Sequence, residues 1–148
     1  MTIRLTSLKK ITELKNRMTQ QASVEYAESL RNLEEAQGKL QCMMQTHDDL
    51  INDLHELTGR GVTSQELHAW MQFMLTQRSA ITKQHMLIAN KTEECTAKRD
   101  DLTSAFLDEQ KWLRLQDRRQ LEHRAHVNKL AQEALDEIAV TGHQRVRG

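Results

Sequence analysis

The side chains of this 148-residue sequence that could do chemistry are few and widely spaced. His123 and His126 lie three residues apart and follow Glu122. A zinc-binding helix of the metalloprotease type has its histidines four apart with the glutamate between them, so we expect no metal site here. The cysteines, Cys42 and Cys95, have no Cys-x-x-Cys spacing and do not indicate a disulfide framework.

Other signatures of catalysis are also missing from the sequence. It contains no glycine-rich phosphate loop, nucleophile elbow or pair of carboxylates in a pocket. His47 is expected inside a coiled coil, where a polar residue usually sets the register. The two cysteines are expected as small apolar fillers. The sequence therefore predicts a protein that is not an enzyme and that uses no cofactor and no metal.

The composition indicates the type of secondary structure in which these residues lie. The chain has no proline and five glycines, 3% aromatic residues, and a mean hydropathy of −0.71. Alanine, glutamate, lysine, leucine and arginine dominate, as in long helices and coiled coils. This composition argues against a β-sandwich, a doubly wound α/β domain or a large globular core, and it predicts an all-α fold.

No segment of the sequence is typical of membrane insertion or secretion. No run approaches the roughly 18 apolar residues that a membrane span needs. Charges at Arg4, Lys9 and Lys10 interrupt the apolar region that a signal peptide would require. We therefore expect a cytoplasmic protein without a transmembrane segment.

A single glycine cluster divides the chain. Gly59 and Gly61 can take the left-handed conformation that closes a helix. Thr63 and Glu66 then have the spacing of a capping box that starts the next helix. The sequence predicts one coiled-coil domain, 1–148, with a helix at 3–58, a turn at 59–63, a helix at 64–140 and a polar tail at 141–148.

Residues seven apart form a line along each predicted helix, as a coiled coil requires. In the first helix the line is Tyr26, Leu33, Leu40, His47 and Leu54. In the second it is Leu67, Met74, Ile81, Ile88, Cys95 and Leu102, beside the polar companions Gln77, Gln84, Lys91 and Lys98. Further apolar positions are expected to extend the interface: Phe106, Trp112, Leu113, Val127, Leu130, Ala134 and Ile138. Near the start, Met18, Ala22, Tyr26 and Leu30 step by four, which predicts a stutter that relaxes the supercoil.

Folding the chain back near residue 60 matches apolar residues with apolar residues. Leu54 then faces Leu67, Leu40 faces Ile81, Leu33 faces Ile88, and Leu8 faces Leu113. The predicted fold class is therefore an elongated two-helix antiparallel coiled-coil hairpin. The second helix is expected to extend about 20 residues beyond the first.

The zero net charge conceals an uneven distribution. Residues 1–20 carry five cations and one acid, and residues 111–129 carry six cations and two acids. The antiparallel register brings these segments to the same end, which would suit an acidic partner or phosphates. The alternatives are an ordinary solvated helix surface, or pairing of these cations with acids across the coil.

Phe73 lies one residue away from the line through Leu67 and Met74, with Ala80 and Leu87 on the same flank. Such an apolar flank on a thin hairpin is a candidate partner surface. The alternative interpretation is a broadened helix interface.

Two sequence blocks suggest a family. The segment GVTSQELHAWMQFMLTQRSAI, residues 61–81, resembles the segment that follows the helix break in the flagellar export protein FliJ family. The segment LDEQKWLRLQDRRQ, residues 107–120, resembles the later Leu-Gln-Asp-Arg run of that family. Length and the position of the single glycine break are also similar over nearly the whole chain.

The resemblance implies a coiled coil similar to the central stalk of rotary ATPases. It implies a non-enzymatic stalk and adaptor that inserts into the hexameric export ATPase ring and contacts the cytoplasmic domain of the membrane export gate. Export chaperones are further implied partners, with a peripheral location at the cytoplasmic face of the inner membrane. The implied gate contacts are Phe73, Gln77, Ala80 and Gln84 on the second helix, and Met43, Thr46 and Leu50 on the first. The expected ATPase-ring contacts are the basic residues Lys9, Lys10, Arg114, Arg118, Arg119 and Arg124.

Three alternatives remain open at this point. A stalk protein of an injectisome secretion system would have a similar sequence. A self-associating coiled-coil scaffold could cover the half-polar second helix with another hairpin. Nucleic-acid binding through residues 111–129 is disfavoured because Trp112 is the only aromatic residue available for stacking there.

Overall fold

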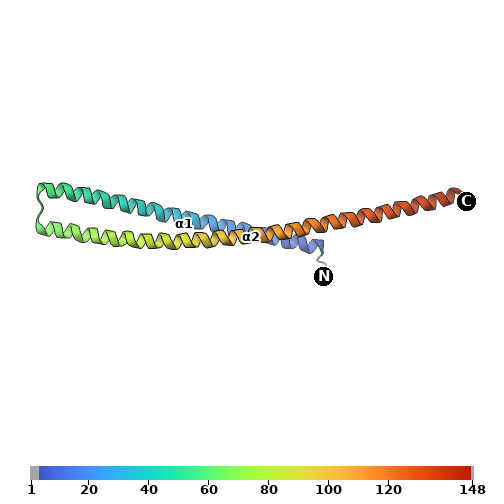
Figure 1. The fold of residues 1–148 in the computed structure, drawn as a ribbon, viewed down its shortest axis with the longest axis horizontal. Helices are drawn as coiled ribbons and strands as arrows, with labels where there is room; N and C mark the ends of the chain where they lie inside the picture. The colour runs from blue at the N-terminus through green and yellow to red at the C-terminus, as the bar shows by residue number, and fades with distance from the viewer. Residues whose placement is uncertain (1–3, 148) are drawn as a thin grey trace. The chain divides into compact units, whose positions relative to one another are not determined.

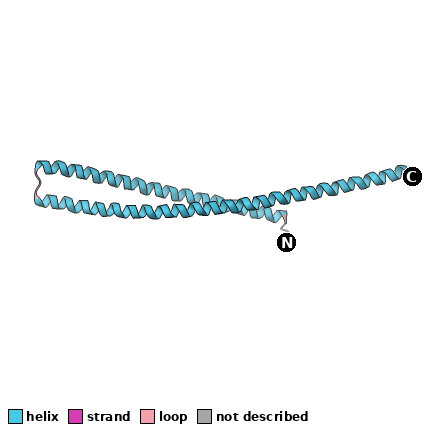
Figure 2. Ribbon diagram, viewed as in Figure 1, coloured by secondary structure: helices cyan, strands magenta, loops and turns pink. Residues whose placement is uncertain are grey.

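The computed structural model describes residues 4–147, and these form two long helices without any strand (Figure 2). Helix α1 spans Leu5–Arg60 and helix α2 spans Ser64–Arg147. The two helices pack against each other in opposite directions. The predicted all-α antiparallel hairpin is confirmed.

The turn between the helices follows the predicted chemistry. Gly61 has a φ of 91°, the left-handed conformation that closes α1. The Glu66 backbone N–H donates to the Thr63 hydroxyl at 3.2 Å, and the Thr63 N–H donates to the Glu66 carboxylate at 3.4 Å. This reciprocal pair satisfies two N–H groups that the start of α2 would otherwise leave unpaired.

Helix α2 is longer than predicted. The expected polar tail after residue 140 is helical through Arg147. No proline interrupts this stretch. Gly142 lowers helix propensity but does not break the hydrogen-bond ladder, so the helix continues through it.

The chain, which Figure 1 colours from its N-terminus to its C-terminus, divides into two compact units. The turn unit is Gln21–Leu102 and contains the ends of α1 and α2 that meet at the turn. The terminal unit consists of the described residues of Met1–Gln20 and Thr103–Gly148. In each unit a segment of α1 runs antiparallel to a segment of α2, and each unit is described by itself below.

In the turn unit the exposure pattern follows the predicted heptads. Ala36 and Cys95 are buried, as are the polar residues Ser29 and Gln84. The predicted half-polar interface of α2 is therefore confirmed at Gln84. Cys42 is exposed, so its prediction as an apolar filler was wrong. Cys42 is exposed because its place in the heptad pattern lies off the helix interface, although its side chain is apolar.

Hydrogen bonds between the helices report the register of the turn unit. Gln84 donates to the Ala36 carbonyl, close to the predicted pairing. His47 contacts Gln77, and Lys98 contacts Glu25, at positions within about one helical turn of that pairing.

The predicted stutter in α1 was wrong. Met18 and Leu30 are 48% and 37% exposed. The low-exposure line instead continues in heptad spacing through Thr12, Lys15, Thr19 and Ser29. Each of the three hydroxyls in this line lies within hydrogen-bonding distance of a carbonyl of its own helix, three or four residues earlier. This local bond removes most of the cost of burying a hydroxyl, so polarity did not exclude these positions from the interface.

The terminal unit has little apolar interior. Leu8 is fully buried, and Thr12 and Glu109 are the buried polar residues beside it. Several later positions that we predicted for the interface are exposed: Phe106, Val127, Leu130, Ala134 and Ile138. Trp112 and Leu113 are partly buried, as expected. The last four exposed positions lie beyond the stretch of α2 that contacts α1, so nothing in the described part of this unit covers them.

Candidate functional site

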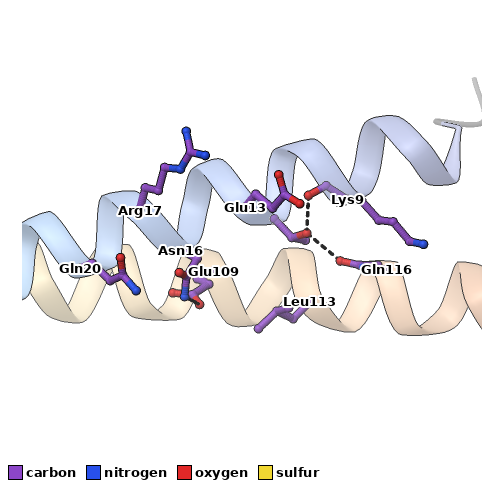
Figure 3. Close-up of a pocket in the computed structure, with 9 residues that line it drawn as sticks. Lys9, Glu13, Asn16, Arg17, Gln20, Glu109, Leu113 and Gln116 are labelled. Atoms are coloured by element: carbon purple, nitrogen blue, oxygen red, sulfur yellow. Dashed lines mark hydrogen bonds between the residues drawn. The ribbon is translucent and has the colours of Figure 1, made fainter.

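Ionised and amide side chains join the two helices of the terminal unit. The Lys15 ammonium lies 2.7 Å from the Asp108 carboxylate. The Asn16 amide donates to a Glu109 carboxylate oxygen at 3.0 Å, and Figure 3 shows these two side chains facing each other. The hydrogen bond from Lys15 holds the pKa of the Asp108 carboxyl below its ordinary value. Hydrogen bonds from Thr19 and Asn16 likewise lower the pKa of Glu109. Both carboxylates are therefore ionised at neutral pH.

Thr12 is one of the residues that line an open groove of about 620 Å³, and Figure 3 shows this groove. The Thr12 hydroxyl oxygen lies 2.9 Å from the Lys9 carbonyl oxygen and 2.7 Å from the Gln116 amide oxygen. Because a hydroxyl has one proton, Thr12 donates to one of these oxygens at a time. Polar side chains from both helices line most of this groove, so it offers hydrogen-bond partners and not an apolar pocket.

The basic residues expected to contact an ATPase ring all lie in the terminal unit. Among them, five are exposed and form no ion pair within residues 4–147: Lys9, Lys10, Arg114, Arg118 and Arg124. The Arg119 guanidinium is partly buried and lies 3.4 Å from the Glu122 carboxylate. Lys15 is the only N-terminal cation in the described chain that pairs across the helices. Most of these cations are therefore available to solvent.

The two units carry net charges of opposite sign. The terminal unit contains 13 lysines and arginines and 8 aspartates and glutamates. The turn unit contains 8 lysines and arginines and 13 aspartates and glutamates. The neutral chain is thus made of one basic and one acidic unit.

Sequence reasoning missed an apolar surface beside the terminal cations. Phe106 and Leu107 are 49% and 62% exposed. They line a groove of about 600 Å³ on one face of α2, together with Gln110, Lys111, Trp112, Arg114, Leu115 and Arg118. Leu107, Arg114 and Arg118 have the spacing of one helix face in the sequence. This spacing is visible in the sequence, but the heptad pattern predicts Phe106 to lie in the helix interface.

In the turn unit, most of the residues expected to contact an export gate line two shallow hollows. One, of about 310 Å³, is lined by Lys39, Cys42, Met43, Thr46, Gln77, Ala80 and Ile81. The other, of about 250 Å³, is lined by Leu50, Ala69, Trp70 and Phe73. Leu50 lies seven residues from Met43, and Phe73 lies seven residues from Ala80. The hollows therefore occupy successive heptads on one side of the helix pair, and we call them together the turn-unit groove.

Phe73 is 52% exposed, so it lies at the edge of the helix interface and not inside it. Gln84 differs from the other expected gate contacts, because it is 6% exposed and donates to the Ala36 carbonyl at 2.9 Å. A partner could reach the Gln84 amide only if the helices separated. Gln77 is partly exposed and contacts His47 Nδ1 at 3.1 Å. The groove therefore presents Phe73, Leu50 and Ala80 but not Gln84.

One carboxyl of the turn unit has a shifted pKa. Hydrogen bonds from Gln21 and from Lys98 lower the pKa of Glu25. The Lys98 ammonium lies 3.2 Å from the Glu25 carboxylate. This pair joins α1 to α2 near Gln21 and Leu102, the limits of the turn unit. It is separated in sequence from the residues that line the groove.

The described chain shows no group of three or more His, Cys, Asp and Glu side chains that could hold a metal ion. His123 and His126 are exposed on α2, and both cysteines are free thiols. Within residues 4–147, neither helix contains a stretch with the length and apolarity that crossing a bilayer requires.

Comparison with known families identifies the family of this hairpin. The family described as the flagellar FliJ protein matches residues 4–148. The chain belongs to the FliJ family. A FliJ-family protein is an export-related protein of the flagellum. No curated protein and no solved structure gives a significant match to the chain.

Proposed function

We propose that this FliJ-family protein is a non-enzymatic stalk and adaptor of the flagellar type III export apparatus. The terminal unit binds the hexameric export ATPase, and the turn unit binds the cytoplasmic domain of the membrane export gate. The observation that carries the proposal is the division of charge, with the surplus of cations confined to the unit that holds the expected ring contacts.

The ring contact is proposed to be electrostatic. Lys9 and Lys10 on α1, and Arg114 and Arg118 on α2, keep their charges free of ion pairs within the described residues. Arg124 lies farther along α2, and Arg119 shares its charge with Glu122. Exposed cations on one unit raise the association rate with an acidic surface, and salt screens that attraction. Binding to the ATPase should therefore weaken as ionic strength rises.

The gate contact is proposed to use the turn-unit groove. Phe73 is a half-exposed aromatic residue at the edge of a hollow that Leu50 also lines. Aromatic residues in such positions often provide much of the binding energy of an interface. Met43, Gln77 and Ala80 extend the contact by one heptad. The gate contact would hold the protein peripherally at the cytoplasmic face of the inner membrane, and export chaperones are proposed as further partners.

The ring contact is tested by ATP hydrolysis of the cognate export ATPase with and without this protein. We expect stimulation by the wild-type chain and a loss of it in the double variant Arg114→Glu/Arg118→Glu. The control is Lys83→Glu, an exposed cation in the turn unit that forms no ion pair in the described structure. Absence of stimulation and of co-sedimentation by the wild-type protein would count against the ring contact.

The gate contact is tested with Phe73→Ala. This variant should bind the cytoplasmic domain of the gate at least about tenfold more weakly and reduce motility. Its circular dichroism should remain close to that of the wild type. Met71→Ala removes a side chain that is 55% exposed but does not line the groove, and it should leave binding unchanged. A large loss of thermal stability in Phe73→Ala would instead assign this residue to the helix interface.

A further inference from the structure

The C-terminal part of α2 has no partner helix. All residues from 121 to 146 are exposed. Among the described residues, the hydrogen bond between α1 and α2 that lies nearest to this end joins Thr12 to Gln116. We call residues 121–146 the C-terminal segment; it is long enough for more than three heptads. Most of the stability of helices in proteins comes from packing of an apolar face, so packing against a partner would stabilise this segment.

One face of the C-terminal segment is apolar. Val127, Leu130, Ala134 and Ile138 are spaced by three or four residues and form a stripe. Val127, Leu130 and Ile138 are 47%, 52% and 68% exposed. Leu130 lies fourteen residues, or about four turns, beyond Gln116, which contacts α1. The stripe therefore continues the face of α2 that already packs against a helix.

Charge divides this end of α2 into two halves. Residues 119–129 contain three cations and one acid, and the only ion pair among them joins Arg119 to Glu122. Residues 130–144 contain three acids and no lysine or arginine. The charged residues left without an ion pair in the described chain are Arg124 and Lys129 in the first half, and Glu133, Asp136 and Glu137 in the second. A basic half followed by an acidic half is complementary to a second copy of itself in the opposite direction.

We propose that the C-terminal segments of two copies of this chain bind each other as an antiparallel coiled coil. A two-fold axis between Leu130 and Ala131 places Val127 of one copy against Ala134 of the other. The same axis sets Arg124 opposite Glu137, and it brings Lys129 within one residue of the position opposite Glu133. Val127, Leu130 and Ala134 of each copy are then covered, and the charges on the flanks are paired twice by symmetry. A parallel arrangement would instead set like charges against each other.

The apolar contact is tested by sedimentation of the full chain over the micromolar range, with a matched pair of variants. Ala134 is on the stripe, and Ala125 is nine residues away on the opposite face of the same exposed helix. Ala134→Glu should raise the dissociation constant of the dimer at least about tenfold, whereas Ala125→Glu should leave it within about twofold. A wild-type chain that stays monomeric throughout, or equal effects of both variants, would overturn the proposal.

The orientation is tested by exchanging charges. Arg124→Glu alone and Glu137→Arg alone should each weaken the dimer, because each creates two like-charge contacts about the axis. The double variant Arg124→Glu/Glu137→Arg should recover most of the lost affinity, since each copy then carries both exchanged charges. Failure of the double variant to recover would exclude the antiparallel pairing, even if the wild-type chain dimerises.

Discussion

The turn unit and the terminal unit join the same two helices with different proportions of apolar and polar burial. In the turn unit Ala36 and Cys95 are buried between the helices, and Gln84 satisfies a carbonyl there. In the terminal unit Leu8 is the buried apolar residue among those described, and one ion pair and two hydrogen bonds join α1 to α2. Apolar burial stabilises without direction, whereas buried polar groups stabilise only when their partners are correctly placed.

This difference indicates which unit is easier to open. A polar interface loses little free energy when its groups replace their hydrogen bonds to each other by hydrogen bonds to water or to a charged partner. We therefore expect the helices of the terminal unit to separate more readily than those of the turn unit. The terminal unit is also the basic one, so the charges available for a partner lie on the less firmly joined pair of helices.

The largest expected effect is that of Leu8→Ala. Leu8 is 0% exposed, and the substitution should destabilise the terminal unit by about 2–5 kcal/mol. Amide hydrogen exchange should become faster over residues 5–20 and stay unchanged near the turn. Leu14→Ala removes a side chain that is 54% exposed and should change little. Uniformly faster exchange along both helices would contradict the independence of the two units.

Glu109→Ala should follow, with a loss of about 1–3 kcal/mol. Glu109 is 8% exposed, and its removal leaves the Asn16 amide without its acceptor. The double variant Asn16→Leu/Glu109→Leu replaces both groups by apolar ones and should recover much of the stability. Chemical denaturation followed by circular dichroism measures both. If Glu109→Ala unfolded like the wild type, the polar interface would contribute nothing.

Glycine replacements should give smaller effects of opposite sign. Gly38 is helical, and a Cβ there would meet no atom within 4 Å, so Gly38→Ala should stabilise the turn unit by about 0.5–1 kcal/mol. Gly61→Ala should destabilise it, because Gly61 has a positive φ. Thermal unfolding compares the two variants. Equal shifts in both would show that the turn does not require a left-handed residue.

Acid should produce the smallest effect and should act first on the terminal unit. The pKa values of Asp108 and Glu109 are lowered in the fold, as is the pKa of Glu25 in the turn unit. A carboxyl group whose pKa is lowered in the fold stabilises that fold at pH values above the group's ordinary pKa of about 4. This stabilisation is lost as the pH falls through the lowered pKa. The terminal unit has two such groups and the turn unit has one. The backbone amides of the terminal unit should therefore be the first to lose protection from exchange as the pH falls. Hydrogen exchange at decreasing pH, corrected for its intrinsic rate, measures this.

The sequence was sufficient to predict the two helices, the break between them and the capping box at Thr63 and Glu66. These features depend on local rules of helix termination, which glycine and hydroxyl positions reveal directly. The heptad line through Leu33, Leu40 and Leu54 was equally visible, because apolar residues alone mark it.

The interface of the terminal unit could not be predicted by the same reasoning. Counting apolar residues selected Met18 and passed over Thr12 and Thr19, whose hydroxyls bond to their own helix and therefore tolerate burial. The exposed positions Val127 and Ile138 were assigned to the interface because their spacing was right. Spacing indicates which face of a helix is apolar, but it does not reveal where the partner helix ends.

Of the candidate site, the position of the basic residues in one unit was predictable from charge counting and the antiparallel register. The burial of Gln84 was not, because a glutamine in heptad spacing can either face a partner or satisfy a carbonyl within the coil. Exposure of Phe106 and Leu107 was also missed, since a helix with apolar residues on two faces gives no single answer from periodicity.

The turn at Gly61 also determines the order in which the helices find each other. The residues joined across the coil are 30 apart at His47 and Gln77, 48 apart at Gln84 and Ala36, and 104 apart at Thr12 and Gln116. Each doubling of such a loop adds roughly 0.6 kcal/mol of closure entropy, so pairing should begin beside the turn and proceed outward. During synthesis the first turns of α1 would therefore emerge before all others and be the last to acquire a partner.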